Sequence, residues 1–199
     1  MIYLYSGTPG SGKSLHVAEL IYNSKNGFYS VIGNIPVEKT HKKISYTFCD
    51  NFHITPDFLI SFSKKYFETH RFREGRLKLV IDEAQLLFNS REWQKEGRAE
   101  WLSFFTQHRK YGYDIYLIAQ FDRMLDRQIR SLIEYEFVHR KVSNFGWKGK
   151  LFSFWAMGRL FVCVKIWYPM KEKTGSEFFL MHKKYYKLYD TFSTWEAPE

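Results

Sequence analysis

Cysteine is scarce in this sequence, and its scarcity excludes a framework of disulfide bonds. The two cysteines, Cys49 and Cys163, are far apart in the chain and stand among apolar residues, which is typical of reduced thiols in a protein core. The seven histidines are scattered, and no spacing of cysteine and histidine resembles a zinc site. We therefore expect both cysteines to be buried and the histidines to be surface or packing residues.

Long apolar runs are missing as well. The most apolar stretch, residues 160–169, is interrupted by Lys165 and is shorter than the ~18 uncharged residues that a helix needs to cross a bilayer. Gly7 and Lys13 come before any apolar run that a signal peptide would require. The chain as given is therefore expected to be soluble.

Acidic residues are rare in one part of the chain. The net charge is +9, and residues 139–187 contain eleven lysines and arginines against two acids, Glu172 and Glu177, whereas the rest of the chain has nineteen residues of each sign. Such a segment indicates an anionic partner, either nucleic acid or a membrane surface. A solvated basic face without a ligand is the alternative.

A phosphate-binding motif lies close to the start of the sequence. Residues 7–14 match Gly-x-x-x-x-Gly-Lys-Ser in full, after a β-rich run and before a helical pattern. Glycine permits the backbone angles that turn N–H groups toward phosphate oxygens. Lys13 is expected to reach the β- and γ-phosphates, and the Ser14 hydroxyl to bind Mg²⁺. The predicted nucleotide-binding residues are Gly7, Thr8, Pro9, Gly10, Ser11, Gly12, Lys13, Ser14 and Leu15.

An apolar run that ends in two acids supplies the second half of a nucleotide site. In Leu79-Val-Ile-Asp-Glu83, a strand would deliver Asp82 beside the phosphate loop to hold Mg²⁺ through its water shell. Glu83 would then polarise an attacking water as general base. Two adjacent acids also end ordinary strands, so the combination with the phosphate loop carries the interpretation. We predict an ATP hydrolase that uses ATP and Mg²⁺.

Strand and helix patterns alternate along the first part of the chain, which at 199 residues and 45% hydrophobic content can form one core. This order predicts an α/β P-loop NTPase with a mostly parallel central sheet flanked by helices. Residues 1–138 would form this core, and 139–199 a β-rich, antiparallel, basic extension of it, with turns at 144–146 and 173–175. The predicted strands are 2–6, 30–35, 44–48, 77–81 and 115–119, and the predicted helices are 14–23, 56–67, 98–110 and 123–132.

Polar residues after the strand at 115–119 are candidates for the rest of a catalytic site. Gln120 would sense the γ-phosphate, or would simply end its strand. Arg127 and Arg130 are spaced to share one helix face with Arg123. An arginine supplied across a subunit boundary, called an arginine finger, stabilises transition-state charge; a surface ion pair is the alternative role for each arginine. Arg109 is a competing candidate.

With these segments in view, the chain resembles the zonular occludens toxin (Zot)-like family, the filamentous-phage assembly ATPases also called gene I proteins. The Walker motifs are common to many families, so the middle segments carry the resemblance. The segments that match are residues 7–14, Ile81-Asp-Glu-Ala-Gln85, His108-Arg-Lys-Tyr-Gly-Tyr-Asp-Ile115, Gln120, Leu125-Asp-Arg-Gln-Ile-Arg-Ser-Leu132 and the tail at 184–189.

The resemblance implies an ATPase domain at the cytoplasmic face of the host bacterial inner membrane, where it powers phage assembly and extrusion as a homo-oligomeric ring. Family members carry a transmembrane helix after this domain, so the membrane link would come from a segment outside this chain. Phage DNA and coat or assembly proteins are the implied partners. A DNA-translocating ATPase and a nucleotide-gated scaffold with little turnover remain alternatives. The rings Phe145, Trp147, Phe152, Phe154 and Trp155 would stack bases or pack a small sheet.

Overall fold

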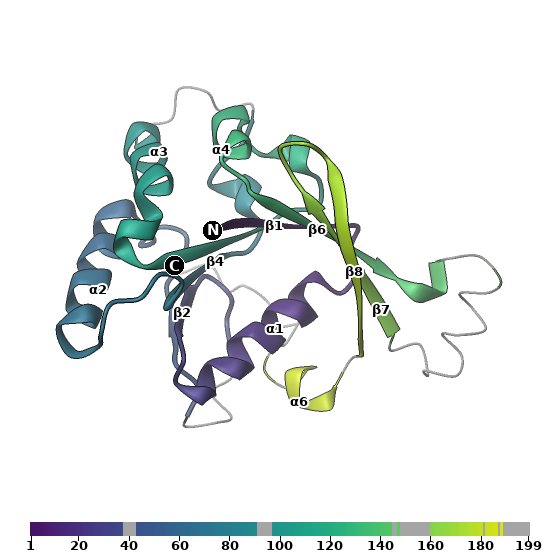
Figure 1. Ribbon diagram of the computed structural model, residues 1–199, viewed down its shortest axis with the longest axis horizontal. Coiled ribbons are helices and arrows are strands. Elements are labelled where there is room, and N and C mark those ends of the chain that lie inside the picture. Colours follow the sequence, from purple (N-terminus) through teal and green to yellow (C-terminus); the bar gives the residue numbers. More distant parts are fainter. Residues whose placement is uncertain are drawn as a thin grey trace, which may run out of the picture.

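The computed structural model of the protein describes residues 1–37, 43–90, 97–144, 147, 160–180, 182–186 and 188. Its strands form one eight-stranded sheet in the order β3-β2-β4-β5-β1-β6-β7-β8 (Figure 1). The pairs from β3 to β6 are parallel, and the pairs β6–β7 and β7–β8 are antiparallel. The predicted α/β class, with a parallel core and an antiparallel extension, is therefore confirmed for the described part of the chain.

The observed elements follow the hydrophobic pattern of the sequence closely. Thr55 caps the helix α2 as its side chain accepts a hydrogen bond from the Phe58 N–H, and Pro56 occupies the first turn, where its missing N–H costs nothing. The strands are β1 (Ile2–Ser6), β2 (Ser30–Gly33), β3 (Tyr46–Phe48), β4 (Leu77–Ile81), β5 (Tyr113–Ile118), β6 (Tyr135–Lys141), β7 (Leu160–Trp167) and β8 (Glu172–Leu180). The α-helices are α1 (Lys13–Asn23), α2 (Pro56–Thr69), α3 (Arg98–Gln107), α4 (Arg127–Ser131) and α6 (Lys183–Tyr186). Short 3₁₀ turns are η1 (Ser24–Asn26), η2 (Ala84–Leu86), η3 (His108–Tyr111), η4 (Asp122–Met124) and η5 (Val142–Asn144).

Helices cover both faces of the sheet, as expected for parallel strands. α2, α3 and α4 lie on one side, and α1 with α6 lies on the other (Figure 1). Alternate residues of β4 supply the two cores: Leu79 packs on the side of α2 and α3, and Val80 packs on the side of α1. Both cysteines are buried and free, as predicted. Among the described residues, no helix has the length and apolar character needed to span a membrane.

The fully buried Leu79 allows a test of the core. Its side chain is 0% exposed, between Ile32 and Ile115 on the neighbouring strands. We expect Leu79→Ala to lower the free energy of unfolding by about 2–5 kcal/mol, because it leaves a cavity that the sheet cannot close. Urea unfolding measures this change. Leu180→Ala, at a side chain 48% exposed, should change it by no more than about 0.5 kcal/mol.

Two local predictions were wrong. Arg123 does not share a helix face with Arg127 and Arg130, because Leu125 is extended and forms a bridge with Asn89, and α4 begins only after this interruption. The chain does not turn at 173–175 either, since these residues lie within β8.

The hairpin between β7 and β8 turns earlier. Lys171 adopts a positive φ of 54°, and its N–H donates to the Tyr168 carbonyl at 3.3 Å. Gly175 pairs with Lys165 beside a β-bulge. Pro169 explains the position, because proline favours a turn over a strand interior.

The remaining predictions concern the boundary at 138/139 and residues near or outside the described part of the chain. The proposed boundary between residues 138 and 139 lies within β6, which continues to Lys141. The predicted turn at 144–146 lies partly outside the described residues. Trp147 is exposed. The rings Phe145, Phe152, Phe154 and Trp155 lie outside the described residues.

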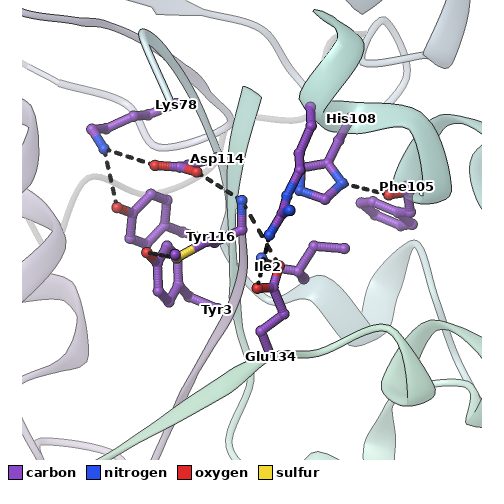
Figure 2. Close-up of polar contacts among 10 residues, drawn as sticks. Ile2, Tyr3, Lys78, Phe105, His108, Asp114, Tyr116 and Glu134 are labelled. Atoms are coloured by element: carbon purple, nitrogen blue, oxygen red, sulfur yellow. Dashed lines mark hydrogen bonds and ion pairs between the residues drawn. The ribbon is translucent and has the colours of Figure 1, made fainter. Parts of the chain in front are cut away.

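A polar network lies at the amino-terminal ends of the parallel strands (Figure 2). The Met1 ammonium group donates to Asp114 Oδ1 at 2.8 Å, and Lys78 Nζ donates to Asp114 Oδ2 at 3.4 Å. Arg109 donates to Glu134 at 3.2 Å within the same network. Because this end of the sheet is opposite to the carboxyl ends of the parallel strands, Arg109 is far from the phosphate loop of its own chain.

Candidate functional site

The phosphate loop leaves the carboxyl end of β1 and enters α1. Gly7, Gly10 and Gly12 have φ values of 139°, 73° and 97°, a region that side-chain-bearing residues rarely adopt. The Gly7 N–H donates to the Gln120 carbonyl at 3.1 Å, which ties the loop to the end of β5. The predicted strand–loop–helix context of the motif is therefore present.

Lys13 joins the loop to the acidic residues after β4. Its ammonium group donates to the Gly7 carbonyl at 2.6 Å and to the Thr8 carbonyl at 3.3 Å. Burial lowers the pKa of Lys13, and the carboxylates of Glu83 and Asp82 partly oppose this shift. The fold thus brings the two halves of the predicted site together.

The Asp82 side chain is largely buried, which disfavours the ionised form of its carboxyl group. Burial raises the pKa of Asp82 to about 6; the Glu83 charge adds to the rise, whereas the Glu83 N–H and Lys13 oppose it. The Glu83 N–H donates to Asp82 Oδ1 at 2.9 Å. A bound cation would favour the ionised form and relieve this cost, so the group suits the predicted Mg²⁺ site with Ser14.

Asn34 supports Asp82 from the neighbouring strand. Its Oδ1 accepts from the Asp82 N–H at 2.7 Å, and its Nδ2 donates to the Asp82 carbonyl at 2.9 Å. Nδ2 also donates to Asn51 Oδ1 at 2.7 Å. The sequence-based prediction missed this clamp because it treated residues 30–35 as a continuous strand. A polar residue just after a buried strand was the available signal.

Glu83 combines exposure with an unusual backbone. Its φ of 46° and ψ of 47° lie in the left-handed region, which is uncommon for a residue other than glycine and is often found at functional sites. Gln85 Nε2 donates to a Glu83 carboxylate oxygen. The predicted general base is therefore held in a defined position beside Asp82.

A family model described as zonular occludens toxin (Zot) matches residues 1–194. The chain belongs to the Zot family. The gene 1 protein of Enterobacteria phage I2-2 is 34% identical to it over 85 residues, which make up 41% of this chain and 23% of that protein. The match thus spans less than a quarter of that relative.

Two of the solved structures that resemble this Zot-family chain bear on its fold. The N-terminal domain of zonular occludens toxin from Neisseria meningitidis has a TM-score of 0.58 at 22% identity, with 95% of this chain and 98% of that one covered. The genome packaging NTPase B204 of Sulfolobus turreted icosahedral virus 2, solved with ATP-gammaS, has a TM-score of 0.52 at 17% identity, with 89% and 95% covered. The predicted family and the predicted P-loop NTPase fold are both confirmed.

A cavity of about 440 Å³ opens beside the phosphate loop of the Zot-family chain. Gly7, Thr8, Gln120 and Arg140 contribute to its wall. Gln120 therefore lies at the strand end where a sensor is expected, in contact with the loop through its carbonyl. The sensing role of its side chain stays a prediction.

The two predicted catalytic arginines lie in α4, and among the described residues neither has a described contact with the phosphate loop of its own chain. Arg127 is exposed at the start of α4, and the charge of Arg130 acts on Asp122 and Tyr168. No contact described for the chain joins either one to Lys13. An arginine finger of the predicted kind would act on the nucleotide of a neighbouring subunit. The catalytic role of Arg127 and Arg130 therefore stays a prediction.

The antiparallel extension packs directly against the phosphate loop. A Cβ at Gly12 would lie 2.8 Å from the Phe161 ring of β7, and a Cβ at Gly7 would lie 2.5 Å from the His139 carbonyl of β6. These glycines are thus required by close packing as well as by backbone angle. The extension forms one wall of the nucleotide site.

Proposed function

We propose that this chain is an ATP-hydrolysing motor domain that powers assembly and extrusion of filamentous phage at the cytoplasmic face of the host inner membrane. The observation that carries the proposal is the convergence of Lys13 with Asp82 and Glu83 in a member of the Zot family. The similarity to a phage gene 1 protein supports the biological setting.

The side chains have the chemistry that hydrolysis requires. Lys13 and the N–H groups of residues 7–14 would bind the phosphates, and Ser14 with Asp82 would hold Mg²⁺, which neutralises charge on the phosphate oxygens. Ser11 Oγ is buried in this loop without a partner among the described residues, so it is available to a phosphate oxygen. Glu83 would take a proton from the attacking water while the water oxygen bonds to the γ-phosphorus. The bond between the γ-phosphorus and the ADP oxygen breaks, and the ADP oxygen leaves with the bonding electrons.

Ring assembly completes the proposal. Arg127 or Arg130 would supply a positive charge to the nucleotide of a neighbouring subunit in the ring. The fold likeness to a genome packaging NTPase is consistent with a motor that works on phage DNA or on coat and assembly proteins. Attachment to the membrane would come through a segment outside this chain.

The decisive experiment is the ATPase rate against protein concentration for the wild-type chain and Lys13→Ala. A rate per subunit that rises with concentration and disappears in the variant supports an assembling motor. An absence of hydrolysis at every concentration, with ATP still bound tightly, would contradict the motor and favour a nucleotide-gated scaffold.

A DNA-translocating ATPase is the second candidate, favoured by the basic residues of 139–187. The same assay with single-stranded DNA tests it. Strong stimulation of the ATPase rate by DNA that falls steeply with salt would favour translocation. An ATPase rate that does not change when DNA is added would favour the assembly motor.

The Asn34 clamp gives a further prediction for this activity. We expect Asn34→Ala to lower the ATPase rate or the Mg²⁺ affinity by about 10–100-fold, because outer residues that orient metal ligands have effects of this size. Initial rates over a range of Mg²⁺ concentrations measure both. Asn26→Ala, at an exposed asparagine, is the control, and equal rates in the two variants would refute the positioning role.

A further inference from the structure

Three potential metal ligands meet behind the phosphate loop. His139 of β6 is directly opposite Cys163 of β7, and Cys163 is directly opposite Glu177 of β8, so the three side chains lie on one face of the sheet. His16, in the first turn of α1, covers the same face. The donor atoms of His16, His139 and Cys163 all lie within 4.8 Å of one another.

The hydrogen bonds of His139 determine which ring nitrogen is available. Its Nδ1 lies 2.9 Å from the Phe137 carbonyl and 3.3 Å from the Ser6 carbonyl. Carbonyl oxygens only accept, so Nδ1 carries the hydrogen and Nε2 has a lone pair. That lone pair points at His16 Nδ1, 2.9 Å away. A carbonyl bound to the outer nitrogen is the usual orientation of a metal-binding histidine.

Aromatic rings lie next to the two imidazoles, and burial keeps both imidazoles neutral. The rings of Tyr5 and Phe179 lie 4.9 Å and 5.1 Å from the His16 ring, between centroids. Burial lowers the pKa of His16 to about 4 and that of His139 to about 3, where His16 adds to the effect. Neutral imidazole is the form that binds metals.

A simple histidine pair accounts for only part of this arrangement. One N–H···N hydrogen bond satisfies the two facing nitrogens of His16 and His139. The Cys163 thiol is 1% exposed, and the described residues provide it with no hydrogen bond. The nearby Glu177 is exposed and raises the pKa of that thiol further above the effect of burial. A bound cation would give the Cys163 sulfur a partner and would also offset the negative charge of Glu177.

We propose that His16, His139 and Cys163 bind one transition-metal ion of the zinc class, with the fourth position taken by water or by Glu177. Two imidazole nitrogens and a thiolate are ligands that Zn²⁺ prefers. On binding, Cys163 loses its thiol proton to solvent, and His16 moves its hydrogen from Nδ1 to Nε2. Ligands about 2.0–2.3 Å from a tetrahedral ion lie roughly 3.3–3.8 Å apart, so small side-chain shifts suffice.

The site would connect the extension to the phosphate loop. His16 follows Ser14 closely on α1, and the His139 carbonyl lies against Gly7. A bound ion would therefore join both ends of the loop to β6 and β7. Its expected role is structural, and it is separate from the Mg²⁺ position at Ser14 and Asp82.

Cobalt titration of the metal-free full chain tests the proposal. We expect one equivalent of Co²⁺ to produce a thiolate-to-cobalt charge-transfer band, which Zn²⁺ then removes. Oxygen ligands at Ser14 and Asp82 produce no such band. Cys163→Ser should abolish it, and His16→Gln should weaken Co²⁺ binding at least tenfold. Cys49→Ser is the matched control, since this second buried free thiol lies outside the cluster.

Several outcomes would overturn the site. A wild-type chain without a charge-transfer band excludes it, whatever the variants do. A band that survives in Cys163→Ser, or that disappears in Cys49→Ser, assigns the thiolate elsewhere. If circular dichroism shows that Cys163→Ser is unfolded, the half-buried His16→Gln variant decides, and unchanged Co²⁺ affinity in that variant refutes the proposal.

Discussion

A Glu83→Gln variant is expected to bind ATP as the wild-type chain does and to hydrolyse it about 10²–10⁴-fold more slowly. The amide has the shape of the carboxylate but cannot accept the proton of the attacking water. Glu83 lies next to Asp82 in a left-handed backbone conformation, with Gln85 donating to its carboxylate, so the substitution removes the base and leaves the phosphate loop intact. Steady-state rates and nucleotide affinity, measured on the same samples, separate the two effects.

An exposed acid away from the site is the control for this result. Glu68→Gln, on α2, should hydrolyse ATP at the wild-type rate. If Glu83→Gln also keeps that rate within about twofold, another group activates the water, and the assignment of the general base is wrong. If ATP binding is lost together with hydrolysis, Glu83 contributes to binding and its catalytic role is not separable.

An Asp82→Asn variant is expected to be inactive and yet more stable than the wild-type chain without nucleotide at pH 7. The pKa of Asp82 is raised from 3.8 to about 6, so the folded state binds a proton more tightly than the unfolded state. Stability is therefore greatest below the unfolded pKa and is lost as pH rises toward 6. Removing the ionised group should add about 3 kcal/mol at pH 7. Asn keeps an oxygen to accept the Glu83 N–H.

Unfolding free energies at pH 5 and pH 7 measure this effect. The wild-type chain should lose stability over this interval relative to Asp82→Asn, because only the wild-type chain has the carboxyl group that ionises. Asp57→Asn, at an exposed acid of α2, is the control and should follow the wild-type profile. Parallel profiles for wild type and Asp82→Asn would show that burial does not strain this carboxylate.

Both variants act on a site whose wall is formed by the extension. Phe161 and His139 pack against the glycines of the phosphate loop, and Glu136 accepts a hydrogen bond from Ser6 at 2.7 Å. β6 is continuous across the predicted boundary at 138/139. Changes in the C-terminal third should therefore alter nucleotide binding, even where they do not touch the predicted catalytic residues.

The parts of the site that were predictable are local in sequence. The phosphate loop at residues 7–14 was predictable because the glycine spacing, the preceding strand and the following helix all depend on residues that are adjacent in the sequence. The apolar run before Asp82 likewise indicates a buried strand with an acid at its end. The prediction that Arg123 shares a helix with Arg127 failed for a non-local reason: Leu125 forms a bridge with Asn89, and this contact interrupts the helix that their spacing indicates.

The sequence by itself determined the class of the fold, the Zot-family resemblance and the phosphate loop with its two acids. Only the tertiary structure decided that Asn34 clamps Asp82 across 48 residues, and that His16 meets His139 across 123 residues. Cysteine and histidine show no metal-binding spacing in the sequence, yet one row across β6 and β7 aligns His139 with Cys163. The physical reason is that short-range patterns reflect backbone preferences, whereas neighbours across a sheet are set by strand order and register.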